Sequence, residues 1–127
     1  MSETAPNYAE LTGQSNPELN GKVTFHLPTV LEQIRIDARI AQLTAPAAFD
    51  ALPSDARGRV RVLATLELLI DTAPKGFYRT NAAGAPELAL SSLPITDEAV
   101  LYEIYMAYMT HYQSFREGSR SAAGNQG

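Results

Sequence analysis

The sequence predicts a mainly α domain of three helices with one or two short β-strands. Apolar residues recur at intervals of three and four over three stretches, residues 30–43, 54–72 and 97–116, as they do in helices that bury one face. A short stretch of alternating apolar and polar residues precedes the first helix and predicts a strand. Two further short stretches after the second helix could pair as a small hairpin.

Both ends of the chain are predicted to lie outside the folded core. Residues 1–20 are rich in Ser, Thr, Asn, Pro, Gly and Glu, which predicts a flexible arm, and the polar residues 117–127 predict a disordered tail. The helical domain is therefore expected over residues 21–116. The chain lacks the basic start and apolar run of a signal peptide, and no apolar run approaches the ~20 residues of a membrane span. We therefore expect no membrane partner.

The first strand is predicted at Lys22–Leu27, where every second residue is apolar. Thr29 and Glu32 then match a capping box, in which each side chain bonds the backbone N–H of the other. The first helix should run from about Val30 to Leu43. Its apolar residues form two rows: Leu31, Ile34, Ala38 and Ala41 in one, and Ile36, Ile40 and Leu43 in the other.

The stretch Ser54–Thr72 is predicted to be the central helix, around which the other elements pack. Its apolar residues at helical spacing are Val60, Leu63, Leu66, Leu69 and Ile70. Val62 and Leu68 fall outside that row, so the apolar surface is wider than one stripe, which is typical of an enclosed helix. Pro74 follows and disfavours helical geometry in the residue before it.

The last third of the chain is predicted to hold the hairpin and the third helix. The hairpin would pair Phe77–Thr80 with Leu88–Ser91, on either side of a loop at Asn81–Ala85. Thr96 is a good N-cap for the last helix, and two acidic residues follow in its first turn, where the helix dipole favours them. This helix should continue to about Arg116.

Residue types exclude several classes of function. The chain has a net charge of −4 and no cysteine, so neither a nucleic-acid footprint nor a thiolate site is expected. Its two histidines, His26 and His111, lie far apart in the sequence, and no nucleophile elbow, phosphate-binding loop or HExxH motif is present. We therefore expect no enzyme, no metal and no cofactor.

The last helix carries more aromatic and methionine side chains than a three-helix core can enclose. The predicted partner-binding residues are Tyr102, Tyr105, Met106, Met109 and Tyr112. Tyrosine combines a large apolar body with a polar tip, and methionine adapts to irregular partners, so both are common at interfaces. The alternative is that half of them belong to the core and the others are ordinary exposed side chains.

Three stretches together resemble the tail assembly chaperones of long-tailed bacteriophages: VTFHLPTVLEQIRIDARIAQL, LATLELLIDTAPKGF and DEAVLYEIYMAYMTHYQSFR. That family tends to show a short strand, an LPT-type helix start, a helix ending in Ala-Pro-x-Gly-Phe and a last helix closing on Ser-Phe-Arg. Here the two endings are residues 73–77 and 114–116. The resemblance covers about Val23 to Arg116 and consists of capping, turn and packing residues.

The resemblance implies a function in the host cell cytoplasm. The partner would be the tape measure protein, a long, apolar, helical chain that aggregates before the tail tube polymerises around it. A chaperone of this family would cover its apolar helical segments, and it could self-associate as a homo-oligomer. The family offers no catalytic residues to transfer. The alternative is a structural subunit, such as a tail-completion or neck protein, with another tail protein as its permanent partner.

Overall fold

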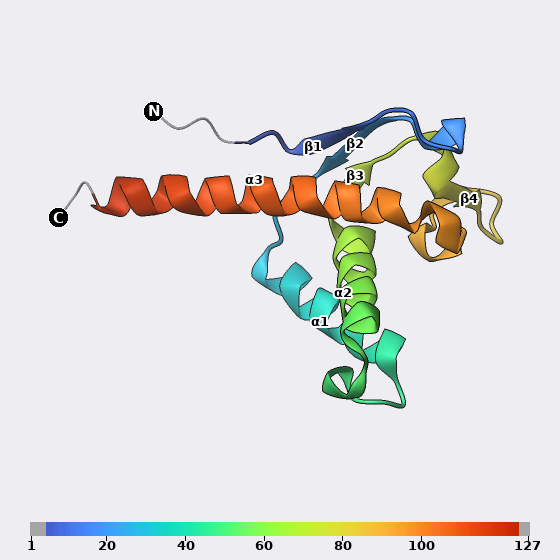
Figure 1. Ribbon diagram of the computed structural model, residues 1–127, viewed down its shortest axis with the longest axis horizontal. Coiled ribbons are helices and arrows are strands. Elements are labelled where there is room, and N and C mark those ends of the chain that lie inside the picture. The colour runs from blue at the N-terminus through green and yellow to red at the C-terminus, as the bar shows by residue number, and fades with distance from the viewer. Residues whose placement is uncertain (1–4, 125–127) are drawn as a thin grey trace.

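The chain folds into two strands, two helices, three further strands and a last long helix, in that order (Figure 1). The structure, a computed structural model, describes the backbone of residues 5–124 and the side chains of residues 5–116. Within these limits the elements are β1 (Tyr8–Leu11), β2 (Gly21–Phe25), α1 (Val30–Thr44), α2 (Ser54–Leu69), β3 (Ile70–Thr72), β4 (Tyr78–Thr80), β5 (Pro86–Leu88) and α3 (Glu98–Gly124). Short 3₁₀ turns join several of them.

The predicted mainly α fold class is wrong, because the fold is mixed α/β. Strands β1, β2 and β3 form an antiparallel sheet in that order, and β4 and β5 form a separate two-stranded sheet. In the larger sheet Phe25 of β2 pairs with Ile70 of β3. The smaller sheet is the predicted hairpin, with Tyr78 opposite Leu88. The larger sheet was missed because two of its strands lie in segments predicted as an arm and as part of a helix.

The predicted flexible arm over residues 1–20 is wrong from β1 onward, and residues 1–4 lie outside the described part of the chain. β1 pairs with β2 and turns Ala9 and Leu11 toward the core, while Leu19 is buried in the turn that follows. These side chains cover apolar surface that the helices leave open. The segment is therefore ordered because burial of its few apolar residues offsets the entropy of fixing it.

The predicted disordered tail over residues 117–127 is wrong for residues 117–124, because α3 continues through Gly124. No proline interrupts this stretch, and the backbone stays helical beyond Phe115, the last large apolar residue. Residues 125–127 lie outside the described part of the chain.

Helix α1 begins as predicted, with a complete capping box. The Thr29 hydroxyl accepts a hydrogen bond from the Glu32 backbone N–H at 3.1 Å, and the Glu32 carboxylate accepts one from the Thr29 N–H at 3.0 Å. Of the two apolar rows, the one containing Ile36 faces α2, and Ile40 and Leu43 pack against the core. The other row, which contains Leu31 and Ile34, faces solvent.

Helix α2 is shorter than predicted, since the chain leaves helical geometry after Leu69. Ile70 has extended backbone angles and enters the sheet opposite Phe25. The backbone N–H of His26 donates to the carbonyl oxygen of Leu69 at 3.0 Å, which satisfies one of the free carbonyls at the helix end. The apolar spacing alone could not reveal this change, because Ile70 fits both a helical row and a buried strand position.

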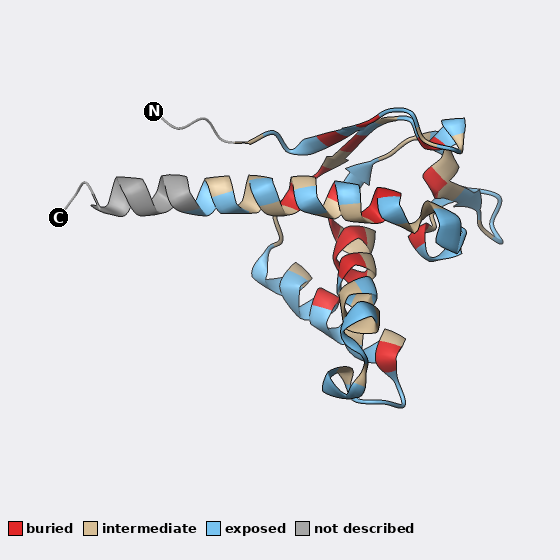
Figure 2. Ribbon diagram, viewed as in Figure 1, coloured by how far each residue is buried: buried red, intermediate tan, exposed pale blue. Residues whose placement is uncertain are grey.

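Helix α3 lies between the two halves of the structure. The larger sheet lies along one side of it, and α1 and α2 project from the other side as a helical hairpin (Figure 1). Buried residues concentrate where α2, the sheet and the first half of α3 meet, whereas α1 is mostly exposed (Figure 2). The largest fully buried side chains are Phe25, Phe77, Leu11, Leu19, Leu66, Leu69, Leu90, Ile104, Val23 and Val100.

Candidate partner-binding surface

The five predicted binding residues share α3 but do not form one continuous surface. Tyr102 lines one cavity, whereas Tyr105, Met109 and Tyr112 line another. Helix α2 contributes a different set of residues to each cavity, so it stands between the two. Met106 lines neither cavity and is 63% exposed. The structure thus divides the predicted patch into two sites and one outward-facing side chain.

The second of these cavities is a groove between α1 and α3, which we call the α1–α3 groove. It has a volume of about 170 Å³. Its lining residues are Gln33, Ile36, Asp37 and Ile40 from α1, Arg61 and Thr65 from α2, and Tyr105, Tyr108, Met109 and Tyr112 from α3. The groove therefore joins most of the predicted residues to the first helix.

Three tyrosines form a row along the α3 side of this groove. Their ring centroids are 6.0 Å apart between Tyr105 and Tyr108 and 6.2 Å apart between Tyr108 and Tyr112. Such tilted ring contacts stabilise an aromatic row and limit its side-chain freedom. Burial is the main cause that raises the pKa of Tyr108 to about 12. The row forms a preformed aromatic wall.

Helix α1 leaves a row of apolar side chains without a partner in the described structure. Val30 is 81% exposed, Leu31 55% and Ile34 58%. Ala38 and Ala41 continue the row along the same face. We call these five residues the α1 stripe. Single exposed apolar residues are ordinary, but three large ones within five positions are a feature of interaction surfaces.

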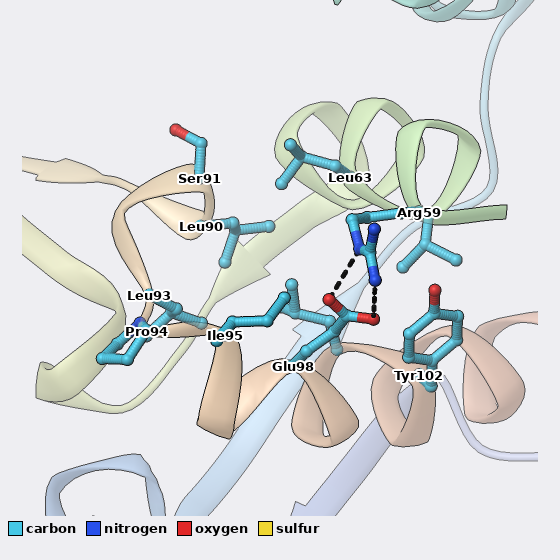
Figure 3. A pocket seen from close by; sticks show the side chains of 11 residues that line it. Arg59, Leu63, Leu90, Ser91, Leu93, Pro94, Ile95, Glu98 and Tyr102 are labelled. Carbon is cyan, nitrogen blue, oxygen red and sulfur yellow. Dashed lines mark hydrogen bonds and ion pairs between the residues drawn. The ribbon is translucent and has the colours of Figure 1, made fainter. Parts of the chain in front are cut away.

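The cavity beside Tyr102 is smaller and more apolar, and we call it the Ile95 pocket. Its volume is about 160 Å³. It is lined by Arg59, Val62, Leu63, Leu90, Ser91, Leu93, Pro94, Ile95, Glu98, Leu101 and Tyr102. Figure 3 shows Glu98 lying between Ile95 and Tyr102, with Arg59 reaching it from α2. This pocket could not be predicted from the sequence, because it depends on how closely residues 90–95 approach α2.

His26 lies between two carboxylates at the start of α1. Its Nε2 is 2.7 Å from Glu32, and its Nδ1 is 2.7 Å from Asp71 on β3. Hydrogen bonding to Glu32 is the main cause that raises the pKa of His26 above 6.5, with Asp71 adding to it and burial opposing it. The same hydrogen bond lowers the pKa of Glu32. The imidazolium thus ties the first turn of α1, next to the α1 stripe, to the sheet.

We expect His26→Gln to lower stability in a pH-dependent way. Because the folded-state pKa of His26 is raised, its contribution is fully present below pH 6.5 and is lost as the pH rises through the folded-state pKa. Because the pKa of Glu32 is lowered, its share is present above pH 4.5 and is lost as the pH falls through that folded-state pKa. The difference in melting temperature between wild type and variant should therefore be largest between these values and small at pH 9. A difference that does not change with pH would contradict the ionic contact.

The two histidines, His26 and His111, have different partners and do not form one site. The Nδ1 of His111 donates to the carbonyl oxygen of Ala5 at 2.6 Å, and the Ala5 N–H donates to the Ser114 hydroxyl at 2.9 Å. His111 therefore holds the segment before β1 against α3. Within the part of the chain that the structure describes, no group of three or more His, Cys, Asp or Glu side chains is arranged to hold a metal ion.

The other charged residues near these cavities have structural partners. Arg39 of α1 donates to the Glu67 carboxylate of α2 at 2.9 Å, which ties the two helices together. Arg59 bonds Glu98 at 2.7 Å and 3.2 Å. Arg61 lies 5.3 Å from the ring centroid of Phe49. These contacts make Arg39 and Arg59 parts of the fold rather than free charges for an ionic ligand.

Comparisons with known proteins add no family assignment. No protein-family model, no curated protein and no solved structure matches this chain. Of the helices in residues 5–124, none combines the length and apolar character that crossing a membrane requires.

Proposed function

We propose that this protein is a tail assembly chaperone that binds apolar helical segments of a phage tape measure protein in the host cell cytoplasm. It would keep those segments soluble until the tail tube polymerises around them. The observation that carries the proposal is the α1–α3 groove together with the α1 stripe beside it. The α1 stripe offers uncovered apolar side chains at helical spacing, and the groove beside it sets tyrosines and Met109 among polar residues. The resemblance of the sequence to this chaperone family supplies the biological setting.

The α3 side of the groove is long enough to meet two turns of a helix laid across it. Tyr105 and Tyr112 are seven residues apart on α3, which is about 10 Å or two turns. A helix laid between α1 and α3 would present apolar residues at i, i+3, i+4 and i+7 to the aromatic row, as in other helix-in-groove complexes. Met109 adds an adaptable side chain, which suits a chaperone that must accept several segments of one client.

The α1 stripe extends this surface beyond the groove. Covering Val30, Leu31 and Ile34 would contribute roughly 1 kcal/mol or more for each side chain, because each is more than half exposed. Gains of this size favour binding that is reversible rather than permanent, once the cost of association is subtracted. Reversibility is what the proposed function needs, since the client must be released to the growing tube.

Co-expression with the cognate tape measure protein tests the proposal. The wild-type chain should keep the tape measure protein in the soluble fraction, and the double variant Tyr105→Asp with Met109→Asp should lose this effect. Two carboxylates in the groove would be desolvated by an apolar helix, which is strongly unfavourable. The matched control is Thr110→Asp with Gln113→Asp, on exposed positions of the same helix, which should protect as well as wild type.

Two results would overturn the proposal. Circular dichroism must first show that both double variants remain folded. If the groove variant then protects the client as well as the control does, the groove is not the binding site. If the protein is instead found as a fixed component of purified virions, it is a structural tail or neck subunit and not a chaperone.

A further inference from the structure

We infer that α1 can separate from α2 while the rest of the fold stays intact, and that the protonated His26 side chain holds α1 closed. The contacts of His26 with Glu32 on α1 and with Asp71 on β3, which we call the His26 bridge, are complete only with a proton on the imidazole. The fold thus contains a pH-sensitive conformational device. This inference goes beyond the proposed function, because it concerns the protein alone and needs no client.

Little apolar burial holds α1 in place. Of its 15 residues only Ile36 and Thr44 are buried, and most of the helix is exposed (Figure 2). It is flanked by the α1–α3 groove and by another groove of about 450 Å³ between α1 and α2. This α1–α2 groove is lined by Arg35, Ala38, Arg39, Gln42, Ala64, Glu67 and Leu68. A helix with so few buried side chains opens at a lower cost in free energy than the core does.

The segments on either side of α1 can absorb its movement. Residues 26–29 before it and residues 45–48 after it are neither helix nor strand. A few such positions at the ends of an element are enough to act as hinges. The helix can therefore shift without disturbing β2 or α2.

Two ionic contacts tie α1 to the rest of the molecule. Near its middle, the Arg39 guanidinium donates to the Glu67 carboxylate of α2 at 2.9 Å and 3.4 Å. At its first turn, Glu32 lies 2.7 Å from Nε2 of His26, whose Nδ1 lies 2.7 Å from Asp71. Arginine is not deprotonated in proteins, whereas histidine changes its charge near neutral pH. The two contacts therefore differ in their response to pH.

The position of the imidazole between two carboxylates makes its proton essential. The charged ring has two N–H donors, one for each carboxylate, but the neutral ring has only one. After deprotonation one carboxylate faces a nitrogen lone pair, and the other keeps a hydrogen bond but loses the attraction to a positive charge. The backbone N–H of His26 donates to the Leu69 carbonyl oxygen at 3.0 Å, so the residue stays with the sheet. In either neutral tautomer, α1 is therefore held less firmly.

The surroundings of His26 set the direction of the pH response. Among the side chains that the structure describes, its charged partners are Glu32 from α1 and Asp71 from β3, and the end of α2 adds only the uncharged Leu69 carbonyl. Hydrogen bonding to Glu32 is the main cause that raises the pKa of His26 above 6.5, with Asp71 adding to it and burial opposing it. The His26 bridge is thus complete below this raised pKa and weakens as the pH rises through it.

A single introduced thiol measures the opening of α1, because the chain has no cysteine. Ala64 on α2 is 1% exposed and lines the α1–α2 groove, so a reagent reaches a thiol there once α1 moves away. Val100 on α3 is 2% exposed and lines neither groove, so its thiol reports unfolding of the whole domain. At pH 8, Ala64→Cys should react with dithiodipyridine about tenfold faster than Val100→Cys or more, since local opening costs less than global unfolding. Equal rates would overturn the separate opening of α1.

Adding His26→Gln to the Ala64→Cys chain tests the His26 bridge. The two chains carry the same thiol at the same position, so the ratio of their rates at one pH reports the opening of α1. His26→Gln should raise the rate roughly two- to fivefold at pH 6, the range for a partly exposed ionic contact, and the ratio should fall toward one at pH 9. A ratio that does not change with pH would overturn the role of His26.

The matched control is the same substitution at the other histidine. His111 bonds Ala5 and holds the segment before β1 against α3, not α1. His111→Gln in the Ala64→Cys chain should leave the reaction rate unchanged at both pH values. If it reproduces the effect of His26→Gln, the pH response does not come from the His26 bridge, and the inference is wrong.

The consequence for client binding rests on the proposed function. Helix α1 supplies one wall of the α1–α3 groove and carries the α1 stripe, so its opening changes the surface proposed for the client. The thiol measurements, however, use the protein alone. Equal thiol rates together with full protection of the tape measure protein would refute only the movement of α1. Separate opening without any protection would refute only the chaperone function.

Discussion

Replacing Phe25 with alanine is expected to lower the free energy of unfolding by about 3–5 kcal/mol, the usual cost of removing a buried phenyl ring. Phe25 is fully buried, at 0% exposure. Its ring meets the ring of Tyr108 edge to face, with centroids 5.9 Å apart and planes at 83°. It also pairs in the sheet with Ile70 of β3. The single side chain therefore links the sheet, the end of α2 and α3.

Urea denaturation followed by circular dichroism measures this effect. A domain of this size is stabilised by only about 5–15 kcal/mol, so the Phe25→Ala variant should lose a large share of its stability. Phe25→Leu fills most of the space and should cost clearly less. If both variants unfold at the wild-type urea concentration, Phe25 does not hold these elements together.

Replacing Gly76 with alanine is expected to destabilise the fold by about 1–3 kcal/mol, the range for inserting a methyl group into a filled site. A Cβ at this position would lie 2.8 Å from Leu19 Cδ2 and 2.9 Å from the carbonyl oxygen of Glu18. The side chain could move, but the backbone oxygen could do so only if the whole turn at Pro17–Leu19 shifted. The close approach of two chain segments requires glycine here.

Gly58 provides the matched control for this substitution. It lies within α2, and a Cβ there would meet nothing within 4 Å. Gly58→Ala should therefore raise stability by about 0.5–1 kcal/mol, because alanine loses less backbone entropy than glycine in a helix. Thermal melts of the two variants should shift in opposite directions. A melting temperature for Gly76→Ala at or above that of wild type would show that the turn accommodates the methyl group.

Local chemistry could be predicted from the sequence where a few adjacent residues determine it. The capping box of Thr29 and Glu32 fixes the start of α1, and both of its hydrogen bonds are present. The hairpin of β4 and β5 was also predicted near its observed position. These elements depend on neighbouring residues, so their pattern is visible without knowledge of the tertiary fold.

The larger sheet could not be predicted, because its pairing is decided by distant residues. β1 has only four residues, with two buried side chains, and lies in a polar segment. β3 has three residues and directly follows a helix whose apolar spacing runs through it. Neither segment carries enough local signal, and each becomes a strand only because β2 lies between them.

The lining of the α1–α3 groove could be predicted in part from the sequence. Tyr105, Met109 and Tyr112 do meet α1 at one groove. The two apolar rows of α1, however, look equivalent in the sequence, and the row with Leu31 and Ile34 is the one left exposed. The choice depends on where α2 packs. The Ile95 pocket depends on the same long-range packing, and of its lining residues only Tyr102 was among the predicted binding residues.

The contact between Ala5 and Ser114 spans 109 positions of the sequence. A ribosome delivers the first strand long before it delivers the helix on which that strand rests. α1 and α2 are neighbours in the chain and can associate early, but β1 lacks its contact with α3 until residues 98–124 have been synthesised. Closing so long a loop costs entropy and slows folding. The domain therefore closes only after α3 has been synthesised, and until then the nascent chain exposes apolar surface.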